Sequence, residues 1–227
     1  AMQARGCNVS MPNKTVIHKY LDKLTPAAEL AGAVNTVIND DGVLTGHITD
    51  GVGYMRSLKD AGFDVIGKKM TIVGAGGAAT AICIQAAVAE LSIFNQDDEF
   101  FARAEETVKK INEKTNCKAK LFRLEDKEAL RTEIADSVIF TNGTGMGMKP
   151  YVGQTYIEKD MLRPDLIVSD VVYQPAKTRL LELAEEVGCP TINGLGMMLF
   201  QGAEAFKCWT GQEMPIDHMK EFLFGDK

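Results

Sequence analysis

The sequence has little of what metal centres and disulfide frameworks require. Three histidines and five cysteines occur in 227 residues, and no CxxC motif or Cys/His cluster shows the spacing of a zinc site. Because the cysteines are widely separated and odd in number, we expect reduced thiols and no metal. These cysteines are Cys7, Cys83, Cys117, Cys189 and Cys208.

An excess of positive charge and long apolar runs are also lacking. Lys and Arg number 25 against 31 Asp and Glu, and no basic run offers a partner for a phosphate backbone. The apolar stretches fall short of the ~18 residues that span a bilayer. The start of the chain, AMQARG, has no apolar core like that of a signal peptide. We therefore expect a cytoplasmic protein that binds neither nucleic acid nor membrane.

Strand-like and helix-like patterns alternate from residue 68 onward. The apolar segment MTIVG leads through glycines into a small-residue helix over 77–90, and the strand LSIF follows. Helices are then expected over 100–114, over 126–134 and in TRLLELAEEVG, which ends on Gly188. Further strands are expected in KAKLFRL, SVIFTNGT, DLIVSDVV and PTING. This alternation predicts a mostly parallel sheet with helices on both faces.

The first 50 residues have a different pattern. A helix precedes two short strands that are joined at Asp40-Asp41-Gly42, a hairpin-type turn signal. The helix GVGYMRSLKDAG then leads into the sheet region, and the tail from Met197 predicts two helices with a break over 211–215. We expect an α/β fold with a Rossmann-type sheet domain and a second, smaller α/β domain.

The segment IVGAGGAATA is the strongest local signal. Its glycines, Gly74, Gly76 and Gly77, close a strand and open a helix, so that backbone N–H groups can approach a pyrophosphate. The spacing is not a strict GxGxxG, and Ala78 or Ala79 stands where a third glycine would allow close packing. A tight turn without a ligand is the alternative, but a strand before and a helix after favour a dinucleotide site.

The end of the second strand should select the cofactor. In a dinucleotide fold an acidic group about 20 residues on binds the ribose 2′-OH of NAD, whereas a basic group accepts the 2′-phosphate of NADP. Here FNQDDEFF supplies Asp97 and Asp98, with no Arg or Lys between Phe94 and Phe101. NAD is therefore favoured over NADP. The alternative for both carboxylates is a solvated helix start, where acidic residues are common.

Two ionisable residues outside the Rossmann region are candidates for proton transfer. Lys14 follows the proline of NVSMPNK, and Asp50 lies in HITDG. Hydride transfer from an alcohol requires a group that moves the hydroxyl proton, and a paired lysine and carboxylate can do so. His18 and His47 are rival bases, and a solvated lysine after an X-Pro turn is the structural alternative for Lys14.

Seven segments in order resemble the shikimate dehydrogenase family: NVSMPNK, GAVNTV, TDGVGY, VGAGGAATA, TNGTGMGMKP, DVVYQP and NGLGMMLFQGAEAF. FNQDDEFF and GMKP are most similar to its quinate/shikimate dehydrogenase branch. The resemblance implies that Lys14 and Asp50 are catalytic. It implies a substrate-binding set of Asn35, Thr49, Tyr173 and Gln201. The implied cofactor-binding set is Gly74, Ala75, Gly76, Gly77, Ala78, Asn95, Gln96, Asp97, Asp98, Thr141, Asn142 and Gly194.

The resemblance also implies a domain division and shows three departures from the family pattern. Residues 1–51 and 198–227 would form the substrate-binding domain, and residues 52–197 the NAD(P)-binding Rossmann domain. The family carries a further N-terminal segment, so we expect this substrate domain to be N-terminally short. Ile48 stands where an Asn is usual, and the connection QAAVAELSIF is short, as if residues were missing or the helix trimmed. A homodimer is compatible with the resemblance.

The expected function is an oxidoreductase that interconverts shikimate and 3-dehydroshikimate, with quinate and 3-dehydroquinate left open as a further substrate pair. NAD is the expected cofactor and NADP the alternative. Two other interpretations stay open. The protein is a non-catalytic module that binds a dinucleotide or metabolite, or it is an NADP-dependent shikimate dehydrogenase of aromatic amino acid biosynthesis.

Overall fold

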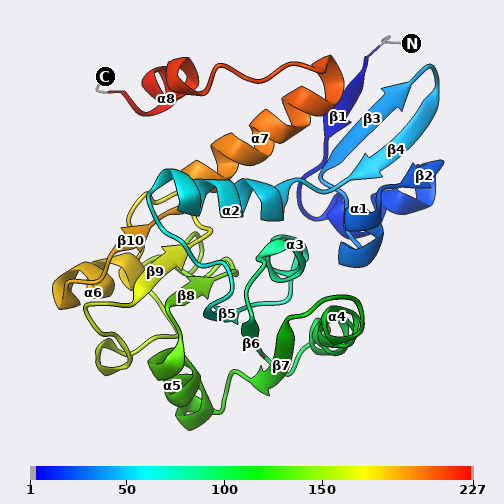
Figure 1. The fold of residues 1–227 in the computed structure, drawn as a ribbon. Helices are drawn as coiled ribbons and strands as arrows, with labels where there is room; N and C mark the ends of the chain where they lie inside the picture. Colours follow the sequence, from blue (N-terminus) through cyan, green and yellow to red (C-terminus); the bar gives the residue numbers. More distant parts are fainter. Residues whose placement is uncertain (1–3, 226–227) are drawn as a thin grey trace.

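A computed structural model describes residues 4–225, which form two sheets with helices between and around them (Figure 1). The smaller sheet has four strands in the order β1-β3-β4-β2. Its strands are β1 (Gly6–Asn8), β2 (Lys23–Leu24), β3 (Thr36–Asp40) and β4 (Val43–His47). Strands β3 and β4 are antiparallel, and Asp41 and Gly42 between them have φ of 52° and 95°. The expected hairpin is therefore present, with the two positive φ values that a tight two-residue turn requires.

The larger sheet has six parallel strands in the order β10-β9-β8-β5-β6-β7. Its strands are β5 (Lys69–Val73), β6 (Glu90–Asn95), β7 (Lys118–Arg123), β8 (Ile139–Asn142), β9 (Ile167–Asp170) and β10 (Thr191–Ile192). The chain moves outward from β5 to β7, returns to β8 and moves outward again to β10. The expected Rossmann-type sheet is confirmed, and its order reverses between β5 and β8, where such sheets bind ligands at their carboxyl ends.

Eight α-helices and three short 3₁₀ helices complete the described part of the chain. The α-helices are α1 (Pro26–Ala31), α2 (Asp50–Asp60), α3 (Gly77–Gln85), α4 (Phe101–Lys114), α5 (Lys127–Asp136), α6 (Arg179–Val187), α7 (Gly194–Thr210) and α8 (Ile216–Phe224). The 3₁₀ helices are η1 (Asn13–Thr15), η2 (Ile17–Tyr20) and η3 (Lys159–Met161). The expected ending of α6 is confirmed, since Gly188 takes φ of 89° in the left-handed region and caps the helix.

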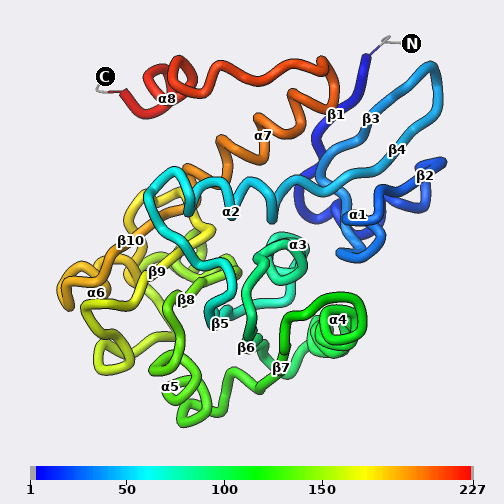
Figure 2. Tube along the Cα trace, viewed as in Figure 1, coloured from blue at the N-terminus to red at the C-terminus, as the bar shows by residue number. Residues whose placement is uncertain are grey.

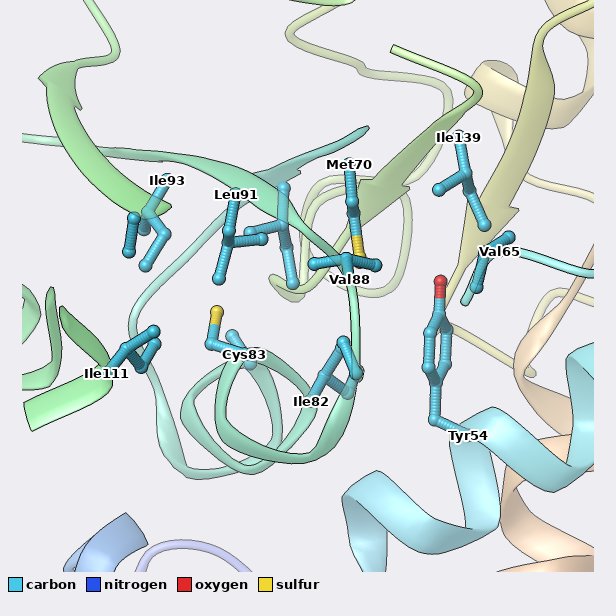
Figure 3. Close-up of a cluster of buried hydrophobic side chains, with 14 of the residues drawn as sticks. Tyr54, Val65, Met70, Ile82, Cys83, Val88, Leu91, Ile93, Ile111 and Ile139 are labelled. Carbon is cyan, nitrogen blue, oxygen red and sulfur yellow. The ribbon is translucent and has the colours of Figure 1, made fainter. Parts of the chain in front are cut away.

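Helices cover both faces of the larger sheet, as the continuous apolar strands predict. On one face, side chains of α2, α3 and α4, including Tyr54, Ile82 and Ile111, pack on Met70 and Leu91 (Figure 3). On the other face, α5 and α6 pack on a second group of buried strand residues. That second group contains Phe94, Phe140, Val168, Leu130, Ile134, Leu180 and Ala184.

Helices α2 and α7 run alongside one another between the two sheets (Figure 2). Gly53 of α2 permits their close approach, because a Cβ at this position would lie 2.5 Å from the backbone N of Gln201. At the far end of α7, Trp209 Nε1 donates a hydrogen bond to Val37 O of β3 at 2.9 Å. The two helices therefore connect the larger sheet to the smaller one.

The helix expected over 77–90 is shorter than predicted. Helix α3 ends at Gln85, Ala87 takes φ of 50°, and β6 begins at Glu90. Val88 is buried in the core, and the backbone N–H of Ala89 donates to Lys68 O at 2.9 Å. The shortness of QAAVAELSIF is therefore accommodated by trimming the helix by about one turn.

The contact between α2 and α7 predicts opposite effects for two glycine substitutions. Gly53→Ala should lower the free energy of unfolding by about 1–3 kcal/mol, because the added methyl group overpacks the interface. Gly202→Ala, one residue beyond Gln201, meets nothing within 4 Å and should raise it by about 0.5–1 kcal/mol through helix propensity. Urea unfolding of both variants checks this, and equal effects would contradict the proposed tight contact.

Candidate active site

Lys14 and Asp50, which are 36 residues apart in the sequence, meet in the structure. Lys14 lies in η1, where its backbone carbonyl accepts the N–H of Val34 at 2.8 Å. Its Nζ donates to Asp50 Oδ2 at 2.5 Å, and the two side chains are only 16% and 5% exposed. Asp50 is the first residue of α2, so the helix N-terminus favours its negative charge. This arrangement forms a nearly buried acid-base pair.

Asn35 joins two other predicted residues, Thr49 and Gln201, to this pair. Its Nδ2 lies within hydrogen-bond distance of Thr49 Oγ1 (3.0 Å), Asp50 Oδ1 (3.0 Å) and Gln201 Oε1 (3.2 Å). Its Oδ1 accepts the backbone N–H of Thr49 at 2.9 Å. Asn35, Thr49 and Asp50 are all buried. The predicted catalytic pair and three of the four predicted substrate residues therefore form one connected cluster.

Ile48 and Tyr173 stand apart from this cluster. Ile48 is fully buried in the core of the smaller unit, against residues such as Val34 and Val37, so its side chain serves packing. Tyr173 is 49% exposed, and within residues 4–225 no hydrogen bond joins it to Asn35 or its partners. Its predicted role as a substrate-lining residue rests on the sequence resemblance alone.

The glycine loop lies next to the Lys14–Asp50 pair. Gly74 takes φ of 113° and its N–H donates to Phe94 O at 2.7 Å. Gly76 caps α3 without a side-chain hydrogen bond, and a Cβ there would meet nothing within 4 Å. The first N–H groups of α3 thus have no helical partner and can bind an anion. A Cβ on Gly77 would lie 3.6 Å from Lys14 Cδ. The anion cradle and the acid-base pair are therefore neighbours.

Asn142 ends β8 beside this loop and shapes the segment that follows it. Its Nδ2 donates to Met146 O at 3.0 Å and to Asp170 Oδ1 at 2.9 Å. Its Oδ1 accepts the hydroxyl of Thr144 at 2.7 Å, and the methyl group of Thr144 would lie 2.8 Å from a Cβ on Gly74. Asn142 therefore holds residues 143–146 against the glycine loop.

Asp170, at the carboxyl end of β9, was not singled out from the sequence. It accepts hydrogen bonds from Asn142, from the backbone N–H of Val172 at 2.9 Å and from the Thr178 hydroxyl at 2.7 Å. Burial disfavours its charged form and raises its pKa to about 6, although the three donors act in the opposite direction. Its place at a strand end near the switch point is the signal that could have found it.

Thr141 and Gly194, two predicted cofactor residues, are buried in the protein interior. Thr141 is fully buried, and its hydroxyl lies 2.6 Å from the Tyr54 hydroxyl of α2. A Cβ on Gly194 would lie 2.1 Å from Val171 O, and its N–H donates to Val172 O at 3.0 Å. Both residues hold the ends of neighbouring elements together. Among the remaining predicted loop residues, Ala75 is buried and Ala78 packs on the core.

The two carboxylates after β6 have different surroundings. Asp98 Oδ1 accepts Asn95 Nδ2 at 2.9 Å and the backbone N–H of Phe100 at 2.9 Å, so it shapes the turn before α4. Asp97 forms an ion pair with Arg123. Arg123 is the last residue of β7 and lies opposite Asn95 in the parallel register. The sequence segment has no basic residue here, but the neighbouring strand supplies one.

The described residues give little support for a metal site or for His47 as the catalytic base. No group of three or more His, Cys, Asp and Glu side chains in residues 4–225 could hold a metal ion. The rival base His47 lies 2.8 Å from the Thr25 hydroxyl through Nδ1, and burial lowers its pKa. In the same part of the chain, no helix has the length and apolar character to cross a membrane.

Two family models match the chain. The Shikimate dehydrogenase substrate binding domain matches residues 1–37, and the Shikimate 5'-dehydrogenase C-terminal domain matches residues 194–223. A shikimate dehydrogenase (NADP(+)) of Listeria innocua is 74% identical over 228 residues, which cover 99% of this chain and 78% of the relative. A protein of the same name from Streptococcus uberis is 53% identical over 234 residues, which cover 100% and 79%.

Solved structures show the same similarity. A shikimate 5-dehydrogenase of Listeria monocytogenes, in complex with shikimate and NAD, has a TM-score of 0.93 and 74% identity, covering 97% of this chain and 78% of that one. A quinate dehydrogenase of Corynebacterium glutamicum, in complex with NAD, has a TM-score of 0.84 and 31% identity, covering 96% and 76%.

The raised pKa of Asp170 predicts a pH-dependent effect on stability. Its protonated form is favoured in the folded state, so its stabilising contribution is complete below about pH 4 and is lost as the pH rises through about 6. The free energy of unfolding of Asp170→Asn minus that of the parent should therefore rise by about 2–3 kcal/mol from pH 4 to pH 7. Urea unfolding at several pH values measures it. Asp165→Asn, whose side chain is 80% exposed, is the control, and an equally flat difference for Asp170→Asn would contradict the prediction.

Proposed function

The chain belongs to the shikimate dehydrogenase family, and on this premise we propose that it interconverts shikimate and 3-dehydroshikimate by hydride transfer. A nicotinamide cofactor, when bound, would supply the hydride chemistry. One observation carries the proposal: the Lys14–Asp50 pair is nearly buried and lies against Gly77, at the start of the helix that can hold a pyrophosphate.

The pair provides the proton transfer that the reaction needs. In the oxidative direction the hydride would pass from C3 of the ring to the cofactor. Lys14, as the neutral amine formed after its ammonium has released a proton to solvent, takes the proton of the C3 hydroxyl. In the reductive direction Lys14 returns that proton to the carbonyl oxygen. Asp50 stays hydrogen-bonded to Lys14 and Asn35, so it keeps the amine in one position throughout.

The side chains around the pair fit a polyhydroxylated ring. Asn35, Thr49 and Gln201 present amide and hydroxyl groups, which can both donate to and accept from substrate hydroxyls. Tyr173 would also line this site, as the sequence resemblance implies. Quinate carries similar ring hydroxyls, and the likeness to a quinate dehydrogenase structure supports it as a further substrate.

The cofactor would lie across the carboxyl ends of β5, β6 and β8. Residues 74–78 and the start of α3 would hold the pyrophosphate, and residues 95–98 the adenosine ribose. Asn142 would position the nicotinamide end through the loop it shapes, with Thr141 and Gly194 supporting it from within. Asp97, together with the uncharged Gln96, favours NAD. Arg123 beside Asp97 favours NADP as a second cofactor, which agrees with the NADP(+) in the names of the relatives.

We also propose the domain division stated from the sequence, with residues 1–51 and 198–227 binding substrate and residues 52–197 binding the cofactor. Helices α2 and α7 connect the two units, and α4 adds a further contact. Arg103 Nη2 donates to Ala31 O of α1 at 3.2 Å, and burial lowers the pKa of this guanidinium. Relative motion of the units would then open and close the site around the ligands.

Lys14→Ala should lower the turnover number by about 10²–10⁴-fold, because the proton transfer loses its acid-base group. The dissociation constant for NAD should stay within about threefold, since the pyrophosphate is held by backbone N–H groups. Initial rates of shikimate oxidation and calorimetric titration with NAD measure the two effects.

Lys19→Ala is the matched control, since Lys19 is an exposed lysine of the adjoining 3₁₀ helix, and it should retain full turnover. Equal turnover in all three proteins would remove Lys14 from the mechanism. A parent chain that binds NAD without turning over shikimate would favour the non-catalytic module instead.

A further inference from the structure

We infer that Arg123 and Asp97 together set the choice between NAD and NADP, with the carboxylate serving the ribose 2′-OH of NAD and the guanidinium the 2′-phosphate of NADP. This inference rests on the proposed function, since it concerns the adenosine end of the same cofactor site. It assigns a role to Arg123, a residue of β7 that lies outside the glycine loop and outside the segment after β6.

The position of Arg123 follows from the strand register. Strands β6 and β7 are adjacent and parallel at one edge of the larger sheet (Figure 1). They end at Asn95 and Arg123, which are paired in the register. In a dinucleotide fold the adenosine ribose lies just beyond the second strand of the unit, which here is β6. The guanidinium would therefore lie near the 2′ position of a bound adenosine ribose.

The ion pair between Arg123 and Asp97 is weak enough for a ligand to displace one of its partners. The two side chains are 56% and 60% exposed, and an ion pair at that exposure is weak. Asp98 differs, because its Oδ1 accepts two hydrogen bonds within its own turn. Of the two carboxylates, Asp97 is thus the one that can exchange its partner for a ligand.

Arg123 also contacts an aromatic ring, and this contact does not depend on Asp97. Its guanidinium carbon lies 5.1 Å from the centre of the Phe101 ring, at the start of α4. A guanidinium over an aromatic face keeps its charge and its planar set of donors available. When a 2′-phosphate approaches, the guanidinium can bind it with two parallel hydrogen bonds, while Asp97 is repelled and turns toward solvent. With NAD, Asp97 accepts the ribose hydroxyl and Arg123 balances its charge.

The kinetic test compares shikimate oxidation with NADP and with NAD. Arg123→Gln should lower the ratio of kcat/KM for NADP to kcat/KM for NAD by about tenfold or more, because a charge-assisted phosphate contact is lost. Asp97→Asn should raise the same ratio, because the repulsion of the phosphate is removed. An unchanged ratio in Arg123→Gln would overturn the inference.

Arg5→Gln is the matched control. Arg5 forms an ion pair with Asp40 whose side chains are 58% and 62% exposed, nearly the same as for Arg123 and Asp97. That pair lies on the smaller sheet, where Asp40 ends β3. The substitution removes the same charge from the same kind of pair and should leave the cofactor ratio unchanged. A change in Arg5→Gln equal to that in Arg123→Gln would make the effect one of net charge and would overturn the inference.

A binding measurement separates this inference from the proposed activity. Adenosine 2′,5′-bisphosphate and adenosine 5′-monophosphate differ only in the 2′-phosphate, and calorimetric titration of both needs no turnover. Arg123→Gln should reduce the preference for the bisphosphate by about tenfold. If the parent oxidises no shikimate while this preference depends on Arg123, the proposed function fails and the inference stands. If the parent is active and the preference is insensitive to Arg123, the inference fails alone.

Discussion

The Lys14–Asp50 ion pair is the constraint on which the site depends. Taking both charges out of water costs several kcal/mol per ion, and good geometry with further hydrogen bonds is needed to offset that cost. The structure meets the requirement from three directions. The turn after Pro12 brings the ammonium, the N-terminus of α2 holds the carboxylate, and Asn35 satisfies the second oxygen. The smaller sheet and α2 therefore have to assemble around this pair.

The sequence predicts those parts of the fold whose signals are local. Short continuous apolar runs place the strands of the larger sheet, and Gly188 correctly ends α6, because these features depend on neighbours a few residues away. The end of α3 could not be predicted in this way. An alanine-rich segment carries no stop signal, and the helix ends at Gln85 because the burial of Val88 and the pairing of Ala89 with Lys68 redirect the chain.

The same distinction between local and non-local signals applies to the residues of the candidate site. Lys14, Asn35 and Asp50 were found from residue type and resemblance, and the structure brings them together. Arg123 and Asp170 were missed because their partners come from other strands: Asp97 precedes Arg123 by 26 residues and Asn142 precedes Asp170 by 28. Their proximity depends on which strands are neighbours and in which register, and no spacing rule within one segment reports that. Parallel sheets concentrate such pairs at their carboxyl edge.

The amide of Asn35 has a consequence for how α7 can move relative to the smaller sheet. An amide nitrogen carries two protons, yet three oxygens lie around this one, and Gln201 Oε1 is the most distant at 3.2 Å. One oxygen is therefore always in excess. If α7 moves away and takes Gln201 with it, both protons of Asn35 remain bound to Thr49 and Asp50, and no buried donor is orphaned. The contact between Asn35 and α7 has a surplus acceptor, so moving Gln201 away carries no hydrogen-bond penalty on the Asn35 side.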